Sequence, residues 1–548
     1  MPSQRAASDA AILECDYLVV GAGAAGCVVA ARLSEDPSAK VVLLEAGGAK
    51  RGLWTKVPAT AFAASIIAET NWGYIGEPEP ALNGRQLQLN AGRVIGGSSS
   101  INGMAWMRGH SRDYDHWRQL GCTGWSGEGV LPFFRKAERS DRGESPLHGG
   151  SGPLYLKRAR VTLPVGELFL TAMKEAGFPL VDDTNGDARE GFGVMDVNIR
   201  NGQRFSAADA YLDPASTRPN LQVIADAQAL QVLVERGRAI GVRHQKGIVR
   251  AAREVILCCG GITTPQLLLV SGIGPADELQ ALGIKPVLDQ PGVGRNLHNH
   301  PSLALTYLLK EPISAFRYLS PLRAASVGLQ YIAGKRGPLG ESYVATSGVF
   351  CTDPALDVAD AMVIMLPALI KRGTVGARVR DVIDRRHGFT VLTSLARERS
   401  RGRVTLKTAD PLQRPAVFHN YYSDPADMPT MVRIVRRVRE AMRTPSAAAR
   451  IAAELSVPAP GNDAAMIESE IRAKGSSFYH YAGTCRMGSD PAAVVDPRLR
   501  FNGIEGLRVA DASIAPAPLN ASMHAPSIMI GEKAAAMIAE DNALRIAA

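Results

Sequence analysis

The first apolar residues of the chain fall into two short runs separated by a glycine-rich turn. The first is YLVV at 17–20, and the second lies within KVVLLEAG at 40–47. Between them, GAGAAG at 21–26 leads into a segment that we expect to be helical from about Ala24 onward. Short continuous apolar runs on either side of a helix are typical of buried parallel strands in a βαβ unit. The pattern therefore predicts an α/β fold at the N-terminus.

A different pattern marks the later part of the chain. Residues 311–474 lack glycine fingerprints and are richer in alternating apolar stretches, for example FTVLTSL at 389–395. Alternation with a period of two predicts strands. We find no internal repeat, and no run of 18 apolar residues that would predict a membrane-spanning helix. At 548 residues, the chain is expected to form two or more packed units.

The composition narrows the class of protein. The chain is 46% hydrophobic with a mean hydropathy near zero, as in ordinary globular proteins. Its formal net charge is +9, but basic and acidic residues are interleaved, so we expect no nucleic-acid partner. Attraction to an anionic substrate or peripheral contact with a membrane is compatible with that charge. Nothing in the sequence predicts the oligomeric state.

The cysteines and the N-terminal residues indicate the cellular compartment in which we expect the protein. Seven cysteines, an odd number, are spread thinly without a CxxC motif, which favours reduced thiols in a cytoplasmic protein. The first 20 residues lack an apolar segment followed by a small-residue cleavage site, so secretion is not expected. The adjacent Cys258 and Cys259 are expected to be buried thiols rather than a redox disulfide.

The glycine turn carries the first candidate chemistry. Gly21, Gly23 and Gly26 form G-x-G-x-x-G, in which the first glycine permits a tight turn, the second lets a pyrophosphate approach and the third lets helix and strand pack closely. Ala24 and Ala25 would open the helix whose N-terminus faces the phosphates. Glu45 ends the second run, nineteen residues after Gly26, and is placed to bind ribose hydroxyls. The unit predicts dinucleotide binding and leaves NAD and FAD open.

Two further motifs show a family resemblance. GRVIGGSSSINGMAWMRGHSRDYD at 92–115 and GGITTPQLLLVSGIG at 260–274 resemble the two signatures of the glucose–methanol–choline (GMC) family of FAD-dependent oxidoreductases. Segments at 291–301, 410–428 and 494–516 are also similar to that family, so the resemblance runs essentially end to end. One departure is Gly261, which stands where a small residue such as alanine is usual and which we expect to matter little. Within the family, choline-dehydrogenase-like and other FAD-dependent alcohol dehydrogenases are the most similar.

The resemblance implies an architecture. It predicts an α/β (α+β overall) chain in which a discontinuous Rossmann-like FAD-binding domain comprises 14–154, 206–310 and 475–548. Residues 155–205 and 311–474 would form the substrate domain, built on an antiparallel sheet with helices.

The resemblance also implies two catalytic histidines. His480, in SSFYHYAGTCRMG, falls at the family's active-site histidine, although Tyr481 and Ala482 replace the usual Pro-Val. His524, in NASMHAPS, falls at the second His or Asn position. Alcohol oxidation removes a proton from the hydroxyl and a hydride from its carbon, so His480 is expected to be the base and His524 its hydrogen-bonding partner. Pro526 suits the first turn of the last helix, whose positive end would stabilise charge on the reduced flavin.

The remaining cofactor contacts follow from the same resemblance. They are expected at Arg93, Gly97, Ser98, Asn102, Gly103, Met104, Ala105, Ala229, Asp511, Ala512, Ala525 and Pro526.

Other functions are less compatible with the sequence. A serine hydrolase lacks support because no G-x-S-x-G motif occurs. His298 and His300 could ligate a metal, but no third ligand lies at a suitable spacing, so we expect no metal and assign them to a loop near the flavin. Inside the family, a hydroxynitrile lyase is a more distant alternative. The electrons are expected to pass to a quinone or another acceptor, and an alcohol oxidase that uses oxygen is the main alternative.

The substrate is not specified by any motif. VIMLPALI at 363–370 only suggests an aliphatic or aromatic alcohol.

Overall fold

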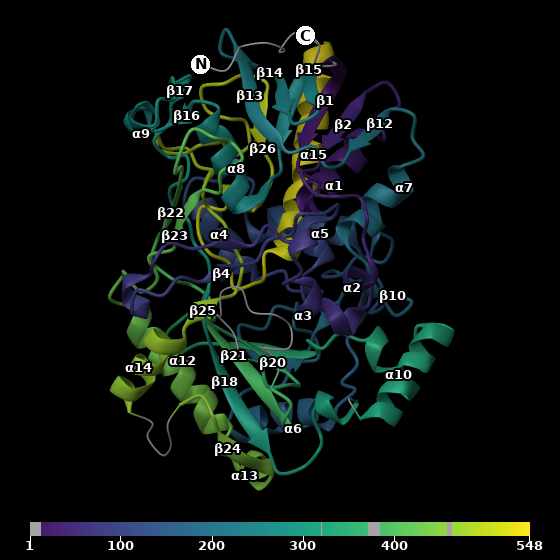
Figure 1. The fold of residues 1–548 in the computed structure, drawn as a ribbon, viewed down its shortest axis with the longest axis vertical. Helices are drawn as coiled ribbons and strands as arrows, with labels where there is room; N and C mark the ends of the chain where they lie inside the picture. The colour runs from purple at the N-terminus through teal and green to yellow at the C-terminus, as the bar shows by residue number, and fades with distance from the viewer. Residues whose placement is uncertain (1–11, 319, 371–383, 458–462, 548) are drawn as a thin grey trace, which may run out of the picture.

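Two sheets, one above the other in Figure 1, organise the chain. The computed structural model describes residues 12–318, 320–370, 384–457 and 463–547. Within these ranges no helix is long and apolar enough to cross a bilayer. The upper sheet contains the N-terminal strand, and the last helix runs beside it (Figure 1).

The upper sheet is built around parallel strands in the order β12–β2–β1–β15, with β26 beside the second half of β15. The hairpin β13–β14 continues it antiparallel beside the first half of β15. The strands are β1 (Ile12–Val20), β2 (Val41–Leu44), β12 (Leu221–Ile224), β13 (Ala229–Glu235), β14 (Arg238–His244), β15 (Gly247–Leu257) and β26 (Leu507–Val509). The predicted βαβ unit is confirmed, because β1 pairs with β2 in parallel and α1 (Ala24–Leu33) connects them.

Helices from both ends of the chain pack together beside this sheet. α1 contacts α15 (His524–Ala547), and α15 also contacts α5 (Gly127–Ala137). α8 (Gly260–Val270) follows β15, and α4 (Ser111–Gln119) precedes α5. Almost every residue of α1 is buried, which explains why most of its residues other than Arg32 are small or apolar.

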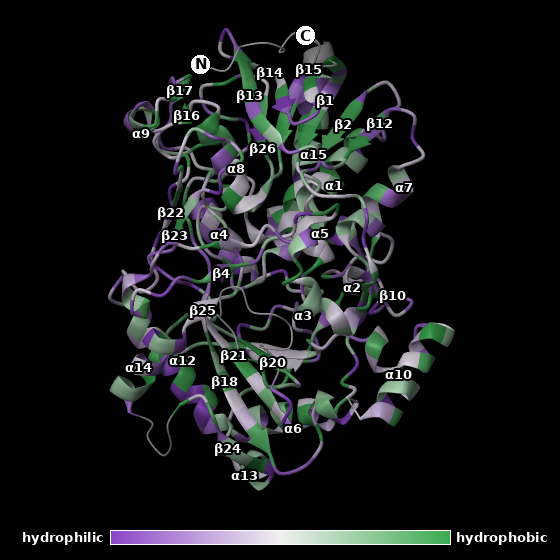
Figure 2. Cartoon of the chain, viewed as in Figure 1, coloured by the Kyte–Doolittle hydropathy of each residue, from purple (hydrophilic) through white to green (hydrophobic). Residues whose placement is uncertain are grey.

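The lower sheet is antiparallel, in the order β24–β18–β21–β20–β19–β8, and β25 also pairs with β18. Its strands are β8 (Gly191–Val194), β18 (Pro301–Leu309), β19 (Thr346–Phe350), β20 (Ala361–Leu366), β21 (Gly388–Leu395), β24 (Ile451–Glu454) and β25 (Ser476–Ser477). The helices that cover it are α6 (Pro164–Glu175), α12 (Asp427–Ala441), α13 (Pro445–Arg450) and α14 (Ala464–Lys474). Figure 2 shows mixed hydrophobic and hydrophilic residues on α12 and α14, as expected of helices with one buried face.

The strand predicted at 389–395 exists as β21, but its two faces are both buried. One face packs against the helices, where Val391 joins the core that includes Val435 of α12. The opposite face carries Leu392, which lines a cavity between the two sheets. The hydroxyl group of buried Thr393 donates a hydrogen bond to the Leu303 carbonyl oxygen at 3.0 Å.

The fold class expected from the sequence is confirmed. The boundaries expected at 310 and 475 assign β18 and β25 to the FAD-binding domain, whereas both strands pair within the antiparallel sheet. The chain enters and leaves the antiparallel sheet several times. Segments that connect the two sheets line the cavity between them.

Candidate active site

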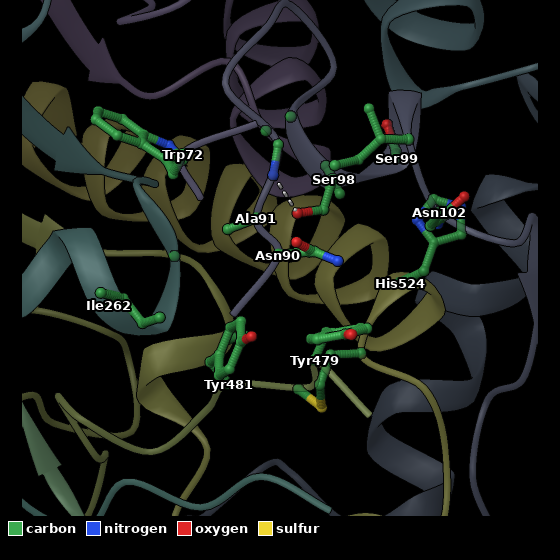
Figure 3. A pocket seen from close by; sticks show the side chains of 18 of the residues that line it. Trp72, Asn90, Ala91, Ser98, Ser99, Asn102, Ile262, Tyr479, Tyr481 and His524 are labelled. Atoms are coloured by element: carbon green, nitrogen blue, oxygen red, sulfur yellow. Dashed lines mark hydrogen bonds between the residues drawn. The ribbon is translucent and has the colours of Figure 1, made fainter. Parts of the chain in front are cut away.

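A cavity of about 800 Å³ lies between the two sheets. This volume lies in the upper part of the range of about 300–1,000 Å³ that is usual for small-molecule and cofactor sites. Its walls come from the β1–α1 turn, the 97–105 loop, the start of α8, β20, β21 and two C-terminal segments. Figure 3 shows Ser98, Asn102, Tyr479, Tyr481 and His524 around it.

The glycine turn has the geometry that the motif predicts. Gly21 has a φ of +100°, and a Cβ there would lie 2.6 Å from the Cys258 carbonyl oxygen. A Cβ on Gly26 would lie only 1.8 Å from the Gly21 oxygen, so helix and turn are in direct contact. Gly23 differs, because a Cβ there would meet nothing closer than 3.7 Å. The protein therefore leaves space at Gly23, on the side where the motif would place a pyrophosphate.

The space at Gly23 lies at the uncapped N-terminus of α1. Gly23 is the N-cap of α1 and provides no side-chain cap, while Ala24 and Ala25 line the cavity. No lysine or arginine is among the described residues that line it. An anionic group here would be held by backbone N–H groups and the helix dipole.

Glu45 also lines the cavity, at the end of β2. Its carboxylate accepts hydrogen bonds from the backbone N–H groups of Ala22 and Gly47, both at 2.8 Å. Burial raises the pKa of Glu45 to about 7, although these N–H groups act in the opposite direction. The carboxylate is thus fixed beside the glycine turn, where the motif expects an acid.

The 97–105 loop lies directly on the glycine turn. The Gly96 N–H donates to the Ala22 carbonyl at 2.8 Å, and Gly97, Ser98, Asn102, Gly103 and Ala105 line the cavity. Arg93 and Met104 do not line it. The Arg93 guanidinium stacks over the Trp72 ring, 5.1 Å from its centroid, and Met104 is buried in a separate cluster.

Arg204 holds this loop and was not singled out by the sequence. It is buried, and its guanidinium donates to the Asn102 side-chain oxygen at 2.7 Å and to the Asn102 and Ser99 carbonyl oxygens. Only the segment NGQRFSAADAYL, which resembles the family, could have suggested it.

The other predicted cofactor residues fall into two groups. Ala229, Asp511 and Ala512 line the cavity. Asp511 accepts hydrogen bonds from Gly260 N–H and the Thr264 hydroxyl, at 2.8 and 2.6 Å. Ala525, Pro526 and Gly26 do not line the cavity. Ala525 and Pro526 lie in the first turn of α15, and Gly26 packs against the Gly21 carbonyl oxygen.

The two predicted catalytic histidines line the same cavity. His524 is the first residue of α15 and is 9% exposed, and neither ring nitrogen has a hydrogen-bond partner among the residues that the structure describes. Its ring lies edge-on to Trp106, with centroids 5.8 Å apart. Burial, assisted by the positive charge of Arg204, lowers the pKa of His524 to about 4. This imidazole is therefore neutral at physiological pH.

His480 is held by residues 298–300, the segment whose two histidines were considered above as metal ligands. Its Nδ1 lies 2.9 Å from His300 Nδ1, and its backbone N–H donates to the Asn299 side-chain oxygen at 2.8 Å. His300 thus contacts the candidate base, whereas His298 has its Nδ1 3.2 Å from the Asn296 carbonyl oxygen.

Gly261 is packed so closely that a larger residue would disturb the structure, contrary to our expectation from the sequence. A Cβ at this position would lie 2.5 Å from the Tyr481 carbonyl oxygen. Alanine, usual in the family, does not fit against this backbone. The two departures at Gly261 and Tyr481 therefore meet in space, next to His480.

Comparisons with known proteins agree with this geometry. Residues 15–302 and 398–531 match the GMC oxidoreductase family. An oxygen-dependent choline dehydrogenase from Sinorhizobium fredii is 40% identical over 531 residues, covering 95% of each chain. Among solved structures, pyridoxine 4-oxidase from Mesorbium loti has a TM-score of 0.85 at 28% identity, covering 96% of this chain and 99% of that one. Formate oxidase has a TM-score of 0.89 at 26% identity, covering 96% and 98%. The chain therefore belongs to the GMC oxidoreductase family.

Proposed function

We propose that this protein is an FAD-dependent enzyme that oxidises an alcohol to the aldehyde or ketone, with His480 as the base. The observation that carries the proposal is the shared cavity. One end has a glycine turn and an uncapped helix, and the same cavity is lined by two imidazoles from separate segments. That combination suits proton removal beside a bound redox cofactor.

The residues present fit FAD. The uncapped start of α1 and the space at Gly23 would receive the pyrophosphate, and Glu45 would bind ribose hydroxyls. Ala229 would lie near the adenine, and the 97–105 loop with Asp511 and Ala512 would contact the flavin. The N-terminus of α15, whose His524 nitrogens lack protein partners, would face the flavin and the substrate. When bound, the cofactor supplies the acceptor for the hydride that leaves the alcohol carbon.

The two histidines would act on the hydroxyl in different ways. His480 would take its proton, a contribution of about 10²–10⁴-fold in rate. His524, neutral because burial lowers its pKa to about 4, would donate a hydrogen bond to the same oxygen as negative charge develops there. Together they would orient the α-carbon for hydride loss.

The cavity wall favours an uncharged alcohol with an apolar chain or ring. Val344, Ile364, Leu366, Leu392 and Phe478 line it. Among the described lining residues the only acids are Glu45 and Asp511, and both carboxylates already accept backbone N–H groups. We assign these two carboxylates to the cofactor end of the cavity, so neither is expected to pair with a cationic substrate such as choline.

For the electron acceptor, a quinone or another carrier is our first proposal. Oxygen is the second candidate, because the choline dehydrogenase that resembles this chain is oxygen-dependent and the two similar solved structures are oxidases.

One experiment tests both parts. Purified protein is mixed with aliphatic alcohols, benzylic alcohols or choline under nitrogen while flavin absorbance is followed. We expect bleaching by an uncharged alcohol, then reoxidation by a quinone faster than by air. Protein that lacks flavin after reconstitution, or flavin that no alcohol reduces, contradicts the proposal, and stoichiometric hydrogen peroxide at the full turnover rate identifies an oxidase.

A further inference from the structure

A buried acid lies behind the candidate base. His300 contacts His480 but does not line the cavity, and Glu398 lies on the far side of His300 with its Oε2 4.0 Å from His300 Nε2. We propose that Glu398, acting through His300, is a positioning residue that holds His480 in the tautomer whose Nε2 is unprotonated. This inference rests on the proposed function, because it concerns the base of that reaction.

The contact between the two imidazoles restricts where their protons lie. His300 and His480 meet through their Nδ1 atoms at 2.9 Å, with ring planes 86° apart. In such a contact, one nitrogen must donate and the other must accept. If both rings are neutral, each carries one proton, so the tautomer of one ring determines that of the other.

Only one of the two arrangements makes His480 a base. When His480 Nδ1–H donates to His300, His480 Nε2 is unprotonated and its lone pair can accept the hydroxyl proton. His300 must then carry its own proton on Nε2. In the opposite arrangement His480 carries its proton on Nε2 and cannot act as a base.

The surroundings of His300 favour the first arrangement. The Glu398 carboxylate faces Nε2, and the backbone carbonyl groups of Leu519 and Ala396 also face the ring. When Glu398 is ionised, its negative charge beside Nε2 stabilises a proton on the nitrogen away from His480. Burial lowers the pKa of His300 to about 4, so the ring stays neutral and the tautomer argument applies.

Hydrogen bonds do not explain why the Glu398 side chain is buried. It is 3% exposed, and neither carboxylate oxygen accepts a hydrogen bond of good geometry. A buried acid without such bonds is costly, and sites of this kind are often functional. The 4.0 Å separation is an electrostatic contact, and catalytic contacts commonly shorten when substrate and cofactor bind.

The charge of Glu398 depends on pH. Burial raises its pKa to about 8, the Arg401 guanidinium and a backbone group of Asn299 lower it, and Asp427 raises it. The phenols of Tyr421 and Tyr422 also face this carboxyl group, and their own pKa values are raised. His298, which faces His300, has a pKa well below its usual value and is neutral. Ionisation of Glu398 is therefore the titration we expect this cluster to show between pH 7 and 9.

A proton on Glu398 would reverse the arrangement. The protonated carboxyl group could donate to His300 Nε2, which would move the His300 proton to Nδ1 and the His480 proton to Nε2. The rate of flavin reduction should consequently rise with pH as Glu398 ionises. When the substrate hydroxyl gives its proton to His480 Nε2, the ionised Glu398 would also stabilise the resulting imidazolium through His300.

The test is anaerobic flavin reduction by an active alcohol from pH 6 to pH 10, with wild type, Glu398→Gln, Glu398→Asp and His300→Ala. In wild type we expect a rise centred near pH 8. Glu398→Gln should lose that rise and reduce its flavin about tenfold more slowly at pH 9, with substrate affinity little changed. Glu398→Asp should keep the rise with a smaller loss of rate. Glu398→Gln combined with His300→Ala should be no slower than His300→Ala alone, because the two residues act in one chain of contacts.

Glu532→Gln is the matched control. Glu532 is also fully buried, but it binds Arg32 and Tyr211 and does not line the cavity. It should alter stability and leave the pH profile unchanged. A Glu398→Gln protein that retains flavin and shows the wild-type profile and rate would overturn the inference. Failure of the proposed function is distinguishable, since wild type itself would then not be reduced by any alcohol.

Discussion

Gly97 rests directly on Gly23: a Cβ built at Gly97 would lie 2.7 Å from the Gly23 Cα. The φ of Gly97 is +51°, a region that other residues adopt at a cost. Two motifs more than 70 residues apart therefore meet through two glycines. Their contact joins the glycine turn to the 97–105 loop.

This contact gives the first prediction. Gly23→Ala should yield a folded protein that has lost its flavin, because the protein leaves 3.7 Å around a Cβ there and a pyrophosphate would use that space. Gly97→Ala should reduce both flavin retention and stability, since it collides with the backbone. Flavin-to-protein absorbance ratio and thermal unfolding distinguish the two. Gly328→Ala, which meets nothing within 4 Å, is the control, and normal flavin content in Gly23→Ala would count against the assignment.

The second prediction concerns the histidine pair. His480→Ala should retain FAD but slow flavin reduction about 10²–10⁴-fold. His524→Asn should be milder than His524→Ala, because an amide can still donate a hydrogen bond to the substrate oxygen. Anaerobic stopped-flow reduction with normal and α-deuterated alcohol measures these effects. If His480→Ala reduced its flavin at close to the wild-type rate, the base would have to be another residue.

Arg204 supplies the third prediction. Arg204→Met should loosen the 97–105 loop and lower FAD affinity about tenfold or more, because several buried carbonyl oxygens lose their donor. The nearby Arg200→Met is the control, since Arg200 is exposed and only stacks over Phe205. FAD titration of the apoprotein compares them. Equal affinity in both variants would show that Arg204 does not organise the site.

The sequence predicted the N-terminal βαβ unit well, because its apolar runs and glycines are local signals. It also placed His480 and His524 at the same cavity, but only through the family resemblance, since no local pattern relates two segments 44 residues apart. The roles of both residues stay predictions.

Glu398 could not be recognised from local sequence patterns, and the reason is physical. Glu398 lies in LARERSRGR, which resembles an exposed basic segment, yet β21 ends just before it and carries it into the core beside His300. Arg204 and Gly261 were missed or underrated for a similar reason. Their importance comes from long-range contacts that local propensity does not encode.

The fourth prediction is acid destabilisation. The pKa values of His300 and His524 fall from about 6.5 in the unfolded chain to about 4 in the folded protein. The unfolded chain therefore binds more protons between these values, and stability is lost as pH falls from 6.5 toward 4. Each group contributes up to about 3 kcal/mol. Glu45 and Glu398, whose pKa values are raised in the folded protein, act in the opposite direction, so wild type is compared with His524→Asn by urea unfolding at pH 7 and pH 5. The loss of unfolding free energy between pH 7 and pH 5 should be smaller in His524→Asn; an equal change in both proteins contradicts the burial of a neutral ring.

The fifth prediction gives the expected membrane contact a location. On α10 (Pro321–Gly334), Leu322, Leu329 and Ile332 are 88%, 68% and 78% exposed, and the helix projects from the lower right in Figure 1. Residues 321–336 carry Arg323, Lys335 and Arg336 and no acid, which suits an anionic surface. The protein should sediment with vesicles containing phosphatidylglycerol, and less so with phosphatidylcholine alone. Leu329→Ser with Ile332→Ser should abolish sedimentation, whereas a change in oligomeric state instead would identify this face as a subunit contact.

The contact between α1 and α15 has a consequence for biosynthesis. Gly531 of α15 lies so close to α1 that a Cβ there would be 2.8 Å from the Ala25 oxygen, and β26 completes the upper sheet only at residues 507–509. Helix α1 is thus covered by a helix that is synthesised about 500 residues later. Until residues 507–547 have left the ribosome, the nascent chain has an incomplete upper sheet and an uncovered α1. Capture of the cofactor should therefore follow the synthesis of α15, and truncations near residue 524 should give chains that chaperones retain.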